Sequence, residues 1–79
     1  MWYAYIKNNY VEIYLNKIKH IYSVKKCRSI YYKNGIFYFL NDSSIYAYKN
    51  NKLLFSVKTI EKYCEKIIVN KNIYISGND

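Results

Sequence analysis

The side chains that most often bind metals or activate nucleophiles are scarce in this chain, which has one histidine and two cysteines. His20 stands among lysines and has no acidic or cysteine neighbour in the sequence, whereas a metal or nucleophilic site needs partners at defined spacings. We expect His20 to be a half-exposed structural residue, and Cys27 and Cys64 to be buried thiols that behave as small apolar side chains. A zinc site usually has about four ligands, and besides the cysteines only His20 is at hand. The sequence therefore predicts no metal and no cofactor.

Carboxylates for acid–base chemistry are also few. The acidic residues are Glu12, Asp42, Glu61, Glu65 and Asp79. Asp42 and Asp79 each follow a predicted strand, where an aspartate commonly forms a turn by bonding to its own backbone. A glycosidase-type pair must hold two carboxylates about 5 to 9 Å apart, and no spacing here predicts such a meeting. Because the sequence also lacks glycine-rich phosphate loops, His-Glu metal motifs and nucleophile elbows, we predict that the protein is not an enzyme.

Tyrosine is the unusual feature of the composition, with 12 residues in a chain of 79. Most of these rings are expected to pack in the core or across strands, because a ring can be buried while its hydroxyl stays hydrated. A pair such as Tyr31-Tyr32 must still send one ring to the opposite face of a sheet. Exposed tyrosines beside lysines would form a binding face. The predicted binding residues are Lys25, Lys26, Arg28, Tyr31, Tyr32, Lys33, Tyr46, Tyr48 and Lys49.

Three binding functions fit such a Tyr/Lys face. The first is a small inhibitor or adaptor that engages an acidic protein partner, since tyrosine is enriched at protein interfaces. The second is nucleic-acid binding, in which the rings stack on bases and the cations meet phosphates, although Arg28 is the only arginine. The third, by analogy alone, is a lectin-like oligomer with aromatic sugar platforms. A steep dependence of affinity on salt would distinguish nucleic acid from a protein partner.

The net charge of +8 has two explanations that the sequence leaves open. A basic surface attracts anionic partners. The chain is also rich in Lys, Asn, Ile and Tyr, whose codons are AT-rich, so a low-GC genome such as that of a virus or mobile element would give the same balance. Two cysteines are too few for a secreted disulfide framework, and no apolar run reaches the roughly 18 residues of a membrane span. We expect a cytoplasmic protein, in a host cell if it is viral, without a membrane partner.

The chain repeats itself, and repeats decide the fold class. The aligned pairs are residues 3–25 with 36–58 and residues 27–42 with 64–79. The first alignment has no gap and places Tyr3 opposite Ile36, and the second places Cys27 opposite Cys64. The offset differs between the two alignments, so we expect a loop insertion at 59–63. At 79 residues the chain is predicted to form a single domain.

Short runs of aromatic and β-branched residues between Asn-rich turns predict hairpins along the whole chain. Asn34-Gly35, between two apolar runs, is the strongest turn signal. The predicted strands are residues 3–7, 11–15, 18–24, 30–32, 36–40, 45–48, 53–57, 67–69 and 73–76. The predicted fold is therefore all-β, an antiparallel meander of repeated hairpins.

Helical spacing of apolar residues competes with this prediction in two segments. After Asn9, a potential N-cap, the spacing would give an α+β fold with a helix at 10–25. After Thr59, the same spacing would add one short helix near 59–66 to the all-β fold. The repeat partner of the first segment contains turn residues, and this favours strands there.

Residues 36–57 combine a strand that ends near Asp42, a following strand with Tyr46-Ala47, and a last strand with the bulky Phe55. This segment resembles the blade repeats of quinoprotein-type and WD40-type β-propellers. The departures from the family pattern are Lys49 for Asp, Asn51 for Gly and Phe55 for Trp. The resemblance implies a propeller-blade-like arrangement, without residues for a quinone site. Propellers usually have about four to eight blades and this chain holds about two, so we expect a homo-oligomer.

Overall fold

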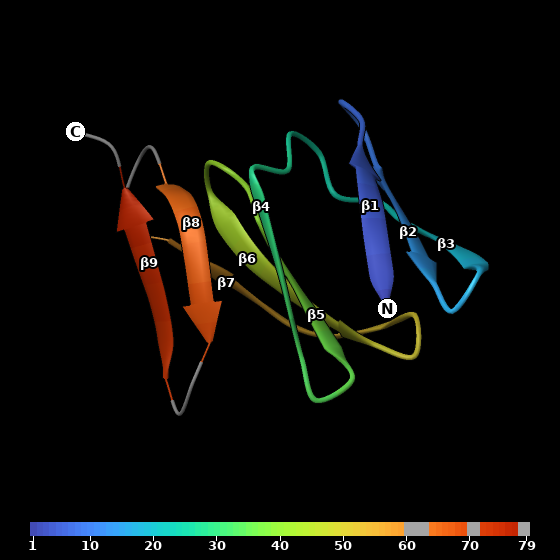
Figure 1. Cartoon of the computed structure of the whole chain (residues 1–79). Coiled ribbons are helices and arrows are strands. Elements are labelled where there is room, and N and C mark those ends of the chain that lie inside the picture. Colours follow the sequence, from blue (N-terminus) through green and yellow to red (C-terminus); the bar gives the residue numbers. More distant parts are fainter. Residues whose placement is uncertain (60–63, 70–71, 78–79) are drawn as a thin grey trace.

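A computed structural model of the chain describes residues 1–59, 64–69 and 72–77. Within these residues it contains nine antiparallel strands in three sheets and no helix (Figure 1). The sheet orders are β1-β2-β3, β4-β5-β6-β7 and β8-β9, so each strand pairs with a neighbour in sequence. The bounds are β1 Trp2–Ile6, β2 Val11–Leu15, β3 Ile18–Tyr22, β4 Ser29–Lys33, β5 Ile36–Leu40, β6 Ser44–Lys49, β7 Lys52–Lys58, β8 Cys64–Val69 and β9 Ile73–Gly77. The predicted all-β meander is confirmed.

Tight turns that begin with asparagine join β2 to β3, β4 to β5 and β6 to β7. These turns are Asn16-Lys17 (φ 50° and 69°), Asn34-Gly35 (53° and 80°) and Asn50-Asn51 (52° and 64°). Positive φ at both central residues is typical of the type I′ turn, whose twist matches that of the flanking strands. Asparagine enters the left-handed region at lower energy than most residues, which explains its place at the head of each turn. The predicted turn at Asn34-Gly35 is confirmed.

The alternative helix at 10–25 is wrong. This segment forms β2 and β3, and the left-handed backbone of the turn between them ends any helical path. In β2, Val11 and Ile13 are fully buried, whereas Glu12 between them is partly exposed, which is the alternation of a strand. Burial of one face of β2 against the second sheet therefore outweighs the helical spacing of the apolar residues.

The short helix near 59–66 is not formed where the structure describes this segment. Thr59 directly follows β7, and its backbone N–H donates to the carbonyl of Ser43 at 2.8 Å. Residues 64–66 belong to β8, which pairs with β9. Residues 60–63 lie outside the described residues. The described part of the chain also contains no helix of the length and apolarity that crossing a membrane requires.

Two hydrophobic clusters hold the sheets together, one on each face of the second sheet. The first cluster lies between the first and second sheets and includes Ile13, Phe37 and Phe39. The second lies between the second sheet and β8 and includes Leu40 and Ile67. Figure 1 shows the three sheets following one another in this order. Successive residues of β5 point to opposite clusters, which explains why this strand is an unbroken apolar run.

A constant shift along the chain matches β1 and β2 with β5 and β6, whereas the register shift between Ala47 and Tyr48 interrupts the match between β3 and β7. The shift that carries β1 onto β5 also carries the turn between β2 and β3 onto the turn between β6 and β7. It pairs Tyr3 with Phe37, whereas the gap-free sequence alignment pairs Tyr3 with Ile36. A slip of one residue moves every side chain to the other face of a sheet. The strand correspondence therefore defines which faces of the two sheets are equivalent.

Candidate functional site

Residues 23–28 connect the first sheet to the second, and their backbone is fixed from both sides. The N–H of Lys26 donates to the carbonyl of Asn8 at 2.8 Å, and the N–H of Arg28 donates to the carbonyl of Leu40 at 2.7 Å. Lys26 has a φ of 51°, so the chain changes direction at this residue. The connection is thus a fixed structure between two sheets.

Side chains of this linker divide between the core and the solvent. Val24 and Cys27 are buried in the first cluster. Their burial leaves Lys25, Lys26 and Arg28 exposed on the surface. The linker therefore exposes three cations, while its buried apolar side chains hold its backbone in place.

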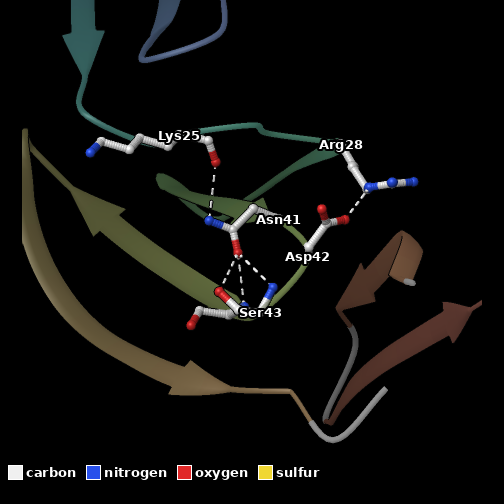
Figure 2. Close-up of polar contacts among 6 residues, drawn as sticks. Lys25, Arg28, Asn41, Asp42 and Ser43 are labelled. Atoms are coloured by element: carbon white, nitrogen blue, oxygen red, sulfur yellow. Dashed lines mark hydrogen bonds and ion pairs between the residues drawn. The ribbon is translucent and has the colours of Figure 1, made fainter. Parts of the chain in front are cut away.

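Asn41 joins this linker to the turn between β5 and β6 (Figure 2). Its Nδ2 donates to the carbonyl of Lys25 at 3.1 Å. Its Oδ1 accepts from the backbone N–H groups of Ser43 at 3.0 Å and Ser44 at 2.8 Å, and from the Ser43 hydroxyl at 3.3 Å. Asn41 is only 8% exposed, so these bonds replace the water that it loses. Asn41 thereby forms the turn, the role that the sequence assigns to Asp42.

Asp42 forms an ion pair instead, between its Oδ1 and Nε of Arg28. Both side chains are partly exposed. Figure 2 shows the side chains of Lys25 and Arg28 extending to opposite sides of Asn41, so the carboxylate of Asp42 is neutralised on the side away from Lys25. Asp79, the repeat partner of Asp42, lies outside the described residues.

A hollow of about 570 Å³ opens between the linker and this turn. The residues of this linker hollow are Ser23, Lys25, Lys26, Asn41, Asp42, Ser43 and Tyr46. The acid among them, Asp42, is already paired with Arg28, which leaves Lys25 and Lys26 to give the hollow a positive charge. Ammonium and hydroxyl groups are the donors that bind carboxylates and phosphates.

The predicted binding residues separate into two groups. Those at or beside the linker hollow are Lys25, Lys26, Arg28 and Tyr46. Those elsewhere are Tyr31, Tyr32, Lys33, Tyr48 and Lys49. Tyr32 and Tyr48 pack against the first cluster and Tyr31 against the second. Lys33 and Lys49 are the last residues of β4 and β6, at the end of these strands opposite to the hollow, so no single Tyr/Lys face unites all of these residues.

Sequence reasoning missed Ser23, Asn41 and Ser43. Asn41 carries a usable signal, because an asparagine at the end of a strand commonly bonds to the backbone two residues later and closes a turn. Ser23 has no comparable signal. Its place in the hollow depends on the path of the linker between two sheets, which is determined by the burial of Val24 and Cys27 and by backbone hydrogen bonds to residues distant in sequence.

The histidine and the described cysteine have no catalytic neighbours. His20 is half-buried on β3, directly opposite Ile13 of β2. The thiol of Cys27 is buried and donates to the carbonyl of Ser29 at 3.4 Å. Burial raises the pKa of this thiol to about 11, which keeps it protonated and unreactive at neutral pH. Among the described residues, no three His, Cys, Asp or Glu side chains could hold a metal ion together, and the side chain of Cys64 is outside them.

We expect the free energy of unfolding to fall as the pH rises from 9 to 11. In the native state Cys27 holds its proton to about pH 11, whereas the unfolded chain releases it near pH 9, so the native state binds more protons in this range. Burial also raises the pKa values of Tyr22 and Tyr48, which steepens the loss at higher pH. Urea unfolding followed by circular dichroism measures the slope. Cys27→Ala should flatten it at the lower end of the range, and an unchanged slope would contradict the burial of the thiol.

The linker hollow is suited to noncovalent binding. Its described lining contains the ammonium groups of two lysines, several hydroxyl groups and the amide of Asn41. Among these described residues, no nucleophile is paired with a general base. No protein-family model, curated protein or solved structure matches the chain. The cations and hydrogen-bond donors that line the hollow are chemically suited to an anionic group.

Proposed function

We propose that the protein is a non-enzymatic binding module, an inhibitor or adaptor, that engages an acidic segment of a protein partner at the linker hollow. The observation that carries this proposal is the exposure of Lys25 and Lys26 at a hollow whose acidic residue, Asp42, is paired with Arg28. A carboxylate of the partner would meet two ammonium groups that form no ion pair within the described residues. The hydroxyls of Ser23, Ser43 and Tyr46 surround the same space and could donate hydrogen bonds to it.

The fixed backbone of the linker favours such binding. The carbonyl of Lys25 is bonded to Asn41 and the N–H of Lys26 to Asn8, so binding orders only the lysine side chains. Each charge pair at an exposed rim contributes about 0.2–1 kcal/mol, and more where the partner excludes water. The net charge of +8 adds attraction at long range and raises the association rate.

Nucleic acid is the second candidate, because a phosphate could occupy the hollow as a carboxylate does. Single-stranded nucleic acids, however, also need exposed ring faces on which bases stack. At the hollow, the ring of Tyr46 packs against the first cluster, as do the rings of Tyr32 and Tyr48. The described residues therefore supply cations at this site without a stacking platform, which favours a protein partner.

Charge reversal at the hollow is expected to weaken binding of an acidic peptide by about tenfold or more, because two attractive contacts become repulsive. The variant is Lys25→Glu/Lys26→Glu, and the probe is a fluorescently labelled oligoglutamate peptide followed by anisotropy at two salt concentrations. Lys49→Glu/Lys52→Glu is the matched control, because it makes the same change of net charge at exposed positions beside the β6–β7 turn, at the opposite end of the strands from the hollow. The control should lose much less affinity.

Equal losses in both variants would show that only the total charge attracts the peptide and would overturn the site. A labelled oligothymidine, measured in parallel, separates the two candidates. If it binds more tightly than the peptide and its affinity falls steeply with salt, nucleic acid takes the place of the protein partner.

The proposal also includes a cellular location and the type of structural repeat. A buried, protonated Cys27 suits the reducing cytoplasm, either of a low-GC organism or of the host of a virus or mobile element. The sequence features at Tyr46-Ala47 and Phe55, together with successive hairpin sheets that pack face to face, support propeller-blade-like repeats.

A further inference from the structure

A second hollow, of about 330 Å³, opens on the first sheet beside the turn between β2 and β3. Its described lining is Met1, Tyr3, Tyr14, Asn16 and Lys17, and most of this lining is apolar. The hollow shares no residue with the linker hollow. Its volume is at the lower end of the range of small-molecule sites, which is about 300–1,000 Å³. We call it the turn hollow.

The alternation of β2 places the turn hollow on the outer face of the first sheet. Val11 and Ile13 of β2 are buried in the first cluster, so Tyr14 points to the opposite face. Tyr3 of β1 is paired directly with Tyr14 and therefore lies on the same outer face. Tyr3 is 53% exposed, so its ring offers apolar surface that the chain itself does not cover.

The two rings that line the turn hollow are held by their neighbours. Tyr3 and Tyr14 stack, with ring centroids 5.0 Å apart and ring planes 11° apart. Tyr5 meets both rings edge-on, at 5.9 Å from Tyr3 and 6.0 Å from Tyr14. The N–H of Asn16 donates to the carbonyl of Met1 at 3.3 Å and so joins the turn to the start of β1. This preorganisation lowers the entropy that binding costs.

Lys17 supplies positive charge at the turn hollow. It is exposed in the turn, with a φ of 69°, and its ammonium group forms no ion pair within the described residues. Glu12, an acid on the same face, is already paired with Lys19 at 3.7 Å. The turn hollow therefore attracts an anion, whereas a cation would be repelled by Lys17 and by the net charge of +8.

The apolar lining and the cation together select a ligand with two parts. An aromatic ring suits the tyrosines, because aromatic rings pack favourably against one another in offset-stacked or edge-to-face contacts. A carboxylate suits Lys17, because it accepts charge-assisted hydrogen bonds from an ammonium group. An anion without a ring would leave the apolar lining in contact with water and would gain nothing from its burial.

We propose that the turn hollow is a binding site for a small aromatic carboxylate, whose ring packs against Tyr3 and Tyr14 and whose carboxylate pairs with Lys17. This inference goes beyond the acidic protein partner proposed for the linker hollow. The two hollows have no residue in common, and the oligoglutamate probe of the linker hollow has no aromatic ring. Either proposal can therefore fail without the other.

Titration of the full chain with naphthoate, followed by NMR chemical shifts, tests the proposal. We expect saturable shifts of the backbone amides of Tyr3, Tyr14 and Lys17. Two further probes separate the parts of the ligand, because naphthylmethylammonium carries the same ring with a positive charge and acetate carries the carboxylate without the ring. Each should bind at least about tenfold more weakly than naphthoate.

Lys17→Gln tests the cation. It should weaken naphthoate binding by about two- to fivefold, the effect of losing an exposed ion pair. Lys7→Gln is the matched control, because it makes the same change of net charge at an exposed residue beyond the other end of β1. The control should bind naphthoate nearly as the wild type does.

Tyr3→Ser tests the ring and should weaken naphthoate binding by about tenfold. Tyr5→Ser is its matched control, because the ring of Tyr5 is also 53% exposed on β1 but does not line the turn hollow. The control should lose less affinity, through the edge-on contact alone.

Several outcomes would overturn the proposal. They are the absence of a saturable shift with naphthoate, shifts confined to the linker hollow, and naphthylmethylammonium binding as tightly as naphthoate. Equal losses in Lys17→Gln and Lys7→Gln would also overturn it, because only the total charge would then attract the ligand. If Tyr3→Ser does not fold by circular dichroism, the shifts of the wild-type chain and the comparison of the two lysine variants still decide.

Discussion

Phe39→Ala is expected to leave the protein largely unfolded at room temperature. Phe39 is fully buried between the first and second sheets, and its ring lies 5.0 Å from Tyr22 and 5.7 Å from Tyr48. Removing a buried phenylalanine ring costs about 3–5 kcal/mol through lost burial and the cavity left behind. A domain of this size has a stability of the same order. Urea unfolding monitored by circular dichroism measures the loss.

Phe55→Ala is the matched control, because it makes the same chemical change on β7, where the ring is 37% exposed. Its ring lies 6.5 Å from Tyr38 and makes no other ring contact among the described residues. We expect a loss of about 1 kcal/mol, typical of a partly exposed site. Equal losses at the two positions would contradict the placement of Phe39 at the centre of the core.

The hairpins are predictable from local sequence because their signals are local. Asn34-Gly35 sits between apolar runs and supplies both positive φ values that the turn needs. The same chemistry recurs at Asn16-Lys17, where Lys17 takes a positive φ without being glycine. That turn lies inside the segment 10–25, whose helical spacing made the sequence ambiguous. Only the burial of β2 against another sheet resolves the ambiguity, and this contact is between residues distant in sequence.

The positions of the tyrosines could not be derived from the repeat alone. A gap-free alignment pairs Tyr3 with Ile36, but the strands pair Tyr3 with Phe37, and the difference exchanges the two faces of the sheet. Tyr48 looked like a binding residue because tyrosine is amphipathic, yet it lies against the first cluster. Among the described residues, the exposed tyrosines are Tyr3 and Tyr5, for which the sequence predicted a place in a strand and no binding role.

The cations of the linker hollow are easier to recognise from the sequence than the uncharged polar residues that line it. Lys25, Lys26 and Arg28 are close in sequence, so any structured linker would keep them close in space. Asn41 meets them only because β4 and β5 pair and bring the end of β5 beside the start of β4. The contact between Asn41 and Lys25 thus depends on strand pairing, and it cannot be predicted from the composition or from residue spacing along the chain.

Asn41→Ala is expected to lower the free energy of unfolding by about 2–4 kcal/mol, because buried partners lose several hydrogen bonds at once. The carbonyl of Lys25 and the N–H groups of Ser43 and Ser44 all bond to the Asn41 side chain. Peptide binding at the linker hollow should weaken as well, since Lys25 loses the contact that fixes its backbone. Urea unfolding and anisotropy with the oligoglutamate probe measure the two effects.

Two further variants separate the turn from the linker. Ser43→Ala removes only the exposed hydroxyl bonded to Asn41 at 3.3 Å, so its effect should be within about 0.5 kcal/mol. Asn41→Asp keeps the oxygen that accepts from Ser43 and Ser44, but it turns the donor facing the Lys25 carbonyl into a second oxygen. The linker contact is then repulsive while the turn survives. Binding should therefore fall in Asn41→Asp further than in Ser43→Ala, and equal binding by these two variants would show that Asn41 stabilises the turn without positioning the lysines.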